Sequence, residues 1–166
     1  AHARIVDSRG KILNIINNYS RISFNFGPTL FRWIEKRFPL LYRRILEVDR
    51  ESLRRLGHGN AIAQVYDHLI MPLANERDKE TEVLWGISDF EKRFQRRPEA
   101  VWLPETAVDY PTLDLLVEQG MKFLVLSPFQ ARRVRPLGGT TWTDVSARRA
   151  DPTPARYTTS PQAGWA

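Results

Sequence analysis

Glu105 is the residue whose type and surroundings point most directly to chemistry. It follows Pro104 and the short apolar run 100–103, which predicts a buried strand. The catalytic residues of parallel β/α barrels lie just past the C-terminal ends of the strands, which is the position that this prediction gives to Glu105. The neighbouring Trp102 adds an indole, and sugar sites often combine a carboxylate with an aromatic face that stacks on the pyranose ring. From spacing alone, a surface glutamate just past a strand is the alternative interpretation.

Two of the three histidines, His58 and His68, lie ten residues apart, and neither belongs to a Cys/His ligand pattern. His68 could donate a hydrogen bond to a sugar hydroxyl or orient Glu105, or it could be a structural histidine of the interior. The sequence has no Gly-x-Ser-x-Gly elbow and no phosphate-binding loop. We therefore expect neither a metal site nor a cofactor.

The composition is that of a globular protein of 166 residues, with 42% hydrophobic and 27% charged residues. This length is enough for one domain with a sizeable core. The chain has no Cys, which excludes disulfides and thiolate metal sites and is consistent with a cytoplasmic location. No apolar run approaches the roughly 20 residues that cross a bilayer, so we expect no membrane partner.

The net charge of +6 raises the question whether the chain binds nucleic acid, and the distribution of the charges bears on it. Residues 1–60 carry twelve Lys and Arg against five Asp and Glu, whereas residues 61–127 carry seven against twelve. Residues 128–166 again have an excess of basic side chains, six against two. An acidic middle argues against a groove that follows phosphates, so we expect no nucleic-acid partner.

The periodicity of apolar residues predicts alternating elements. Residues 8–18 suit a short helix, and the alternation in 21–26 predicts a strand. Helices are expected over 28–38, 40–56, 75–97 and 111–119, with Gly57 and Gly120 after two of them. Further strands are expected at 100–103 and 122–127, and residues 136–166 show no sustained period, which predicts a loop-rich tail. The alternation across 98–127 indicates an α/β fold with parallel β/α units.

Three stretches together resemble glycoside hydrolase family 57. Residues 22–30 are similar to the family's Asn-Phe-x-Pro-Ser/Thr-Leu strand and helix start, and residues 57–73 contain its Tyr-x-His-x-Ile-x-Pro-Leu pattern. Residues 86–120 include Trp-Leu-Pro-Glu, similar to the family's Trp-x-Pro-Glu segment, which makes Glu105 the counterpart of the nucleophile. The resemblance covers roughly residues 12–130, and the order and spacing are more specific than any single motif.

The resemblance implies a portion of an incomplete (β/α)7 TIM-like barrel over residues 1–135 and a retaining mechanism on α-glucans. Glu105 would be the nucleophile, and a polysaccharide or oligosaccharide the partner. His58, Asn60, His68 and Trp102 would contact the substrate. Asn60 stands where many relatives have a glutamate, so one carboxylate of the substrate site becomes an amide.

Two family elements have no match here, the His-containing first strand and the acid/base Asp. We expect the first to precede Ala1 and the second to follow the visible end, and we do not assign Asp144 to that role. The isolated chain is therefore expected to be an inactive fragment of a glycosidase or transglycosidase. Alternatives are a non-catalytic glycan-binding or scaffold protein with the same barrel, and a metal-dependent polysaccharide deacetylase-like enzyme, whose His and Asp ligands the motifs do not supply.

Overall fold

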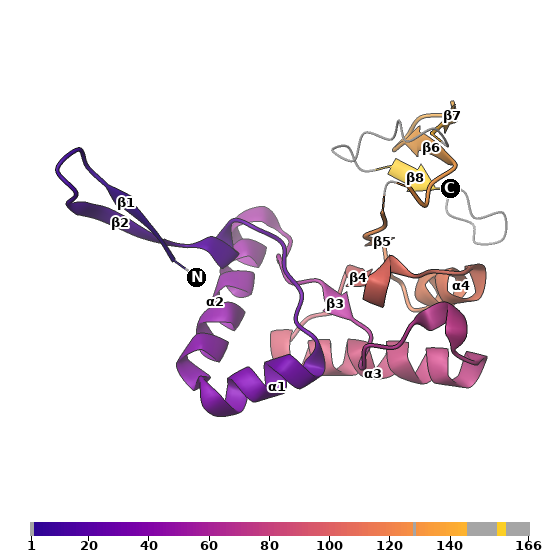
Figure 1. Cartoon of the computed structure of the whole chain (residues 1–166), viewed down its shortest axis with the longest axis horizontal. Helices are drawn as coiled ribbons and strands as arrows, with labels where there is room; N and C mark the ends of the chain where they lie inside the picture. Colours follow the sequence, from indigo (N-terminus) through magenta and orange to yellow (C-terminus); the bar gives the residue numbers. More distant parts are fainter. Residues whose placement is uncertain (1, 128, 146–155, 159–166) are drawn as a thin grey trace.

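A computed structural model describes residues 2–127, 129–145 and 156–158 of the chain. Helices and strands alternate through its central part, and short antiparallel strands lie at both ends (Figure 1). In chain order the elements are β1 (His2–Val6), β2 (Ile12–Asn17), η1 (Asn18–Ser20), α1 (Pro28–Arg37), α2 (Pro39–Leu56), β3 (Ala63–Gln64), η2 (Met71–Leu73), α3 (Glu76–Phe94), β4 (Ala100–Trp102), η3 (Pro104–Thr106), α4 (Tyr110–Glu118), β5 (Phe123–Leu124), β6 (Arg133–Pro136), β7 (Thr143–Asp144) and β8 (Arg156–Thr158).

The central sheet is parallel, with strand order β3-β4-β5. Gln64 is in register with Trp102, and an isolated parallel bridge from Phe24 to Ala61 extends the sheet by one further segment. The helix α3 runs along one side of β3 and β4 (Figure 1). Because all these segments point the same way, the residues that follow them meet at one edge of the sheet.

Two apolar clusters hold the helices on the sheet. The first joins α1, α2 and α3 around the Phe24 segment, and the second joins α3 and α4 to β4. Each cluster draws on the apolar stripe of an amphipathic helix, as the 3.6-residue period predicts. The buried members of the first are Phe24, Phe31, Ile34, Ile45, Leu46, Val48, Ala61, Ala63, Phe90 and Phe94. Those of the second are Val65, Met71, Val83, Ile87, Val101, Leu103, Leu116 and Met121.

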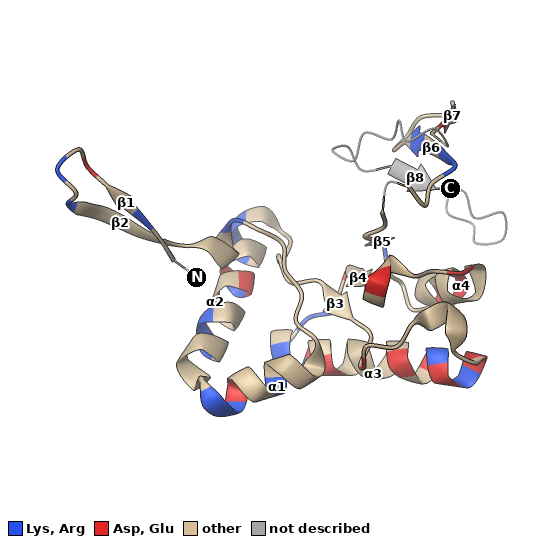
Figure 2. Ribbon diagram, in the orientation of Figure 1, with Lys and Arg blue, Asp and Glu red and all other residues tan. Residues whose placement is uncertain are grey.

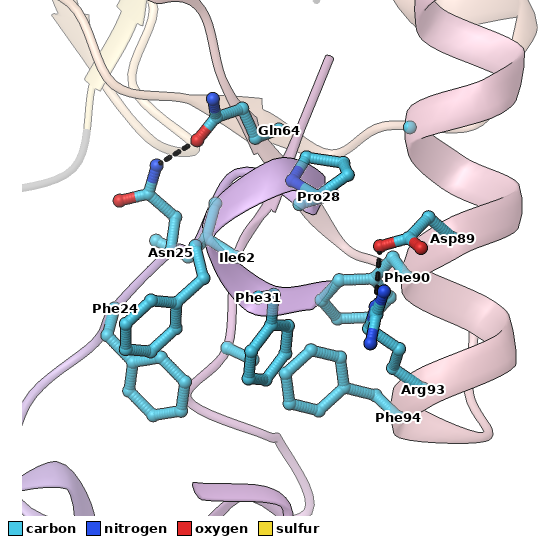
Figure 3. Close-up of a pocket in the computed structure, with 14 residues that line it drawn as sticks. Phe24, Asn25, Pro28, Phe31, Ile62, Gln64, Asp89, Phe90, Arg93 and Phe94 are labelled. Carbon is cyan, nitrogen blue, oxygen red and sulfur yellow. Dashed lines mark hydrogen bonds and ion pairs between the residues drawn. The ribbon is translucent and has the colours of Figure 1, made fainter. Parts of the chain in front are cut away.

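A small hollow lies inside the first cluster. Figure 3 shows the rings of Phe24, Phe31, Phe90 and Phe94 beside it. Its volume is about 10 Å³, close to the least space that one water molecule needs. We therefore assign it to aromatic packing rather than to a ligand.

A buried ion pair fixes the start of the β3 segment. Asp49 of α2 is 1% exposed and accepts hydrogen bonds from Arg96 Nε at 2.9 Å, Arg96 Nη2 at 2.8 Å and the backbone N–H of Ala61 at 2.7 Å. Arg96 also donates to the carbonyl of Ala61. A Cβ at Gly59 would lie 2.3 Å from Arg96 Nη2, so only glycine lets the chain pass this pair.

The helix ends follow the expected chemistry. Pro28 occupies the first turn of α1, and Gly57 ends α2 with φ of 76°. Asn75 caps α3 by accepting a hydrogen bond from the backbone N–H of Asp78. Gly120, predicted to close α4, has φ of 75° directly after the cap residue Gln119. These predicted boundaries are confirmed to within a few residues.

The helix predicted for residues 8–18 is wrong. The structure has an antiparallel hairpin of β1 and β2 that projects away from the helices (Figure 1). Asp7 makes the turn, because its Oδ1 accepts from the backbone N–H groups of Arg9 and Lys11, and Gly10 supplies a φ of 78°. Spaced isoleucines fit a helix by period, but β-branched residues favour a strand when turn chemistry precedes them.

Other differences are smaller. Residues 136–145, predicted as loop, include the last residue of β6 and the whole of β7, two strands of a three-stranded antiparallel sheet completed by β8. Residues 146–155 and 159–166 of the predicted tail lie outside the described residues, and the boundary at residue 135 stays a prediction. The strands predicted at 21–26 and 122–127 shorten to a bridge at Phe24 and to β5.

The surface charges are mixed in sign. Basic residues outnumber acidic ones along α1 and α2, whereas acidic residues are in the majority along α3 (Figure 2). No helix within the described part of the chain is both long and apolar enough to span a membrane.

Replacing Asp49 by Asn tests the buried ion pair. The change leaves the Arg96 guanidinium without its counter-charge, so we expect the free energy of unfolding to fall by about 3 kcal/mol. The matched control is Glu47→Gln in the same helix, which breaks only the exposed pair with Arg44 and should cost less than about 0.5 kcal/mol. Chemical denaturation followed by circular dichroism measures both. Equal stability of the two variants would contradict the role given to the pair.

Candidate active site

Glu105 lies just past the C-terminal end of β4, within the 3₁₀ turn η3. Its backbone has φ of 55° and ψ of 16°, and Thr106 follows with φ of 53°. Left-handed conformations cost non-glycine residues roughly 1–2 kcal/mol each, and a β-branched threonine adopts one rarely. Such strain persists only where the surroundings enforce it, and it is concentrated at functional sites.

Hydrogen bonds on both sides enforce this turn. Backbone N–H groups of Thr106 and Ala107 donate to the carbonyls of Leu103 and Pro104, each at 3.0 Å. The side-chain amide of Gln130 donates to the carbonyl of Thr106 at 2.7 Å. Leu103 and Pro104 are buried, so the turn stands on a rigid base and directs the Glu105 side chain outward.

The next loop is anchored by Asp109, which caps α4 by accepting a hydrogen bond from the backbone N–H of Thr112. The ammonium of Lys79 reaches from α3 to the same carboxylate, and this lysine side chain is buried. Burial raises the pKa of Asp109, but hydrogen bonds from Lys79 and Thr112 outweigh it and hold the pKa below its ordinary value. The loop that carries Glu105 is therefore held at its far end by a charged contact.

Glu105 does not stand alone at this edge. His68 Nε2 lies 3.2 Å from Glu105 Oε1, and the His68 ring lies 6.1 Å from the Trp102 ring, centroid to centroid. The side chains of Glu105 and His68 are 70% and 59% exposed, so both reach solvent. The structure thus brings together three of the residues singled out in the sequence: a carboxylate, an imidazole and an indole.

An open cleft begins at His68 and extends toward α1. It is lined by residues that follow the Phe24 segment and β3, together with one face of α1: Gly27, Thr29, Leu30, Trp33, Gln64, Tyr66, Asp67 and His68. The mixture of aromatic rings, an amide and a carboxylate suits a polar ligand with apolar faces. His68 lines this cleft and also contacts Glu105, so the cleft lies next to the carboxylate.

His58 and Asn60 lie at the opposite edge of the sheet. Both precede β3, whereas Glu105 follows β4, and parallel strands start and end at opposite edges. His58 Nδ1 lies 2.9 Å from Glu99 Oε2, and Asn60 donates to the carbonyls of Tyr19 and Ile22. The structure does not bring these two residues together with Glu105.

Glu99, which sequence reasoning did not single out, organises that opposite edge. It accepts a hydrogen bond from Lys122 Nζ at 2.6 Å as well as contacting His58. The hydrogen bond from Lys122, and then that from His58, lowers the pKa of Glu99. This cluster stabilises the edge where β4 and β5 begin, and it is separate from the strained turn.

Sequence reasoning also missed Gln130 and the Lys79–Asp109 pair. The cap could have been found, because Asp109 stands three residues before Thr112 at the start of a predicted helix. Gln130 gave no signal, since it acts on a backbone carbonyl 24 residues away.

Asp144 lies in β7 and pairs in register with Arg133. Across residues 2–127 and 129–145, no three acidic or histidine side chains gather in a way that could hold a metal ion.

Comparisons with known proteins bear on the fold and family. The family model described as glycosyl hydrolase family 57 matches residues 9–147. A solved 4-alpha-glucanotransferase from Thermococcus litoralis is similar, with a TM-score of 0.51 and 18% identity over 68% of this chain and 17% of that one. A GH57 branching enzyme from Thermococcus kodakaraensis, in complex with glucose, has a TM-score of 0.47 and 21% identity over 63% and 22% of the two chains.

An alpha-amylase from Thermotoga maritima has a TM-score of 0.45 and 15% identity over 66% of this chain and 28% of that one. No curated protein matches the chain. The chain thus spans less than a third of the length of these solved relatives.

These findings confirm the α/β fold class predicted from the sequence, with parallel strands that form a portion of an incomplete barrel. The family match covers most of the chain, including every segment that builds the parallel sheet and the turn at Glu105. This chain belongs to glycosyl hydrolase family 57.

Proposed function

We propose that Glu105 is the nucleophile of a retaining enzyme that acts on α-glucans. The observation that carries the proposal is the strained turn after β4, which presents this carboxylate beside His68 and Trp102 at the C-terminal edge of a parallel sheet. Natural proteins keep such a backbone where a side chain must be aimed, because the strain has no structural benefit of its own.

The chemistry divides between two carboxyl groups. A Glu105 oxygen attacks the anomeric carbon, the glycosidic C–O bond breaks, and a second carboxylic acid protonates the leaving oxygen. The resulting glycosyl ester is then hydrolysed by water, which loses a proton to that second carboxylate, or it is transferred to an acceptor hydroxyl. The two carboxyl groups of a retaining enzyme stand about 5–5.5 Å apart.

His68 and Trp102 have supporting roles in this proposal. The contact of His68 Nε2 with Glu105 Oε1 fixes one oxygen of the carboxylate, so the other is free to approach the sugar. The indole of Trp102 offers an apolar face to the pyranose ring. His58 and Asn60 have no part in this step, because they lie at the other edge of the sheet.

The substrate class rests on family membership and on what the similar solved proteins are. A glucanotransferase, a branching enzyme and an amylase carry related folds, and the exposed site at Glu105 can admit a chain rather than only a small molecule. We infer an α-glucan as the substrate. We further infer that the acid/base carboxylate lies outside the described residues.

Replacing Glu105 by Gln tests the nucleophile. In the protein at its natural length, we expect turnover of amylose to fall by on the order of a thousandfold or more, since an amide cannot form the glycosyl ester. Binding of maltoheptaose should persist, because the amide keeps the shape of the side chain. The matched control is Glu118→Gln on α4, an exposed carboxylate that should leave turnover unchanged. Normal turnover by the Glu105 variant would refute the proposal.

The 166-residue chain by itself should release no reducing sugar from amylose. The reason is that a retaining mechanism needs a second carboxyl group to protonate the leaving oxygen, and we infer that this group belongs to the larger part of the family fold that the chain does not span. A reducing-end assay, with a commercial α-amylase as positive control, measures this. Steady hydrolysis by the purified chain would show that its acid/base group is present after all.

A further inference from the structure

The cleft beside Glu105 has a far wall that the proposed mechanism does not use. This wall is formed by α1, which lines the same cleft as His68. We propose that it is a second sugar-binding subsite, in which a neighbouring glucosyl unit of the α-glucan stacks on the indole of Trp33. The inference rests on the proposed function, because it takes the ligand of Glu105 to be a glucan chain.

Trp33 is the first line of support. Its side chain lines the cleft from α1 and is 52% exposed, whereas Phe31 and Ile34 of the same helix are buried in the core. Its ring contacts Phe38 edge-on, with centroids 5.1 Å apart at 63°. An indole held at this angle by a neighbouring ring, with much of its surface in water, gains most by covering an apolar face such as that of a pyranose.

Gln64 supplies a fixed hydrogen-bond donor to the same cleft. Its Oε1 accepts from Asn25 Nδ2 at 2.9 Å, which orients the amide (Figure 3). Its Nε2 has no hydrogen-bond partner within the described part of the chain, and it faces Gly27, where a Cβ would lie 3.0 Å away. The glycine keeps the space next to this amide open, so the amide N–H is available to a ligand hydroxyl.

Asp67 supplies an acceptor. Its backbone N–H donates to Glu82 Oε2 at 2.7 Å, which ties the loop after β3 to α3, while its carboxylate is exposed in the cleft. An aromatic face, an amide donor and a carboxylate acceptor around one hollow form the set that binds a sugar by stacking and by its hydroxyls. A glucan seated there would pass His68 and reach Glu105 with its next unit.

The subsite predicts a specific loss of binding. The 166-residue chain is titrated with maltoheptaose, and Kd is obtained from the shifts of the indole N–H signals in nitrogen–proton NMR spectra. We expect Trp33→Leu to weaken binding by about tenfold, which corresponds to about 1.4 kcal/mol. Leucine is apolar and at least as good a helix former as tryptophan, but it lacks the flat aromatic face.

The matched control is Trp142→Leu, whose indole lies 5.0 Å from the Arg135 guanidinium carbon and does not line the cleft. This variant should bind within about twofold of the unaltered chain, and circular dichroism spectra check that both variants are folded. The inference is overturned if the unaltered chain does not bind maltoheptaose, or if the two variants bind equally well. These outcomes concern binding alone, so they are distinct from a failure of the Glu105→Gln test, which is read from turnover.

Discussion

The ion pair between Asp49 and Arg96 determines where the parallel sheet starts. It joins α2, the segment after α3 and the backbone of Ala61 through four hydrogen bonds, and Gly59 passes beside it because no side chain would fit. Burying two charges is costly unless each is fully partnered, and here the Asp49 carboxylate has three donors. The start of β3 is therefore fixed relative to α2 and α3. Because the strands are short, the position of their C-terminal ends is fixed as well.

This constraint has consequences at the opposite edge of the sheet. Because β3 is in register with β4, the loop that carries His68 emerges next to Trp102 and Glu105. The close crossing of α3 contributes as well, since a Cβ at Gly86 would lie 2.2 Å from the carbonyl oxygen of Gln64. The packed sheet and helices thus support a turn whose backbone is strained. The Glu105 backbone keeps its left-handed conformation because the surrounding contacts enforce it, not because glutamate favours it.

The sequence predicted most of what depends on local chemistry. Pro28 and Gly57 mark helix ends through their backbone geometry, and the apolar run before Glu105 marked β4. The sequence-based predictions failed where contacts between distant residues, or two competing local preferences, determine the structure. The isoleucines of residues 12–16 satisfy both a helix and a strand, and the turn at Asp7 selects the strand. His58 and Asn60 share a segment with His68, but β3 lies between them and separates the two ends.

Trapping the covalent intermediate tests the central claim most directly. With 5-fluoro-α-glucosyl fluoride, the bond from the anomeric carbon to fluorine breaks without a general acid, and fluoride leaves as a Glu105 oxygen bonds to that carbon. In the protein at its natural length, peptide mass spectrometry should find the sugar ester on Glu105. A label on another carboxylate, or equal labelling after Glu105 is replaced by Gln, would contradict the account.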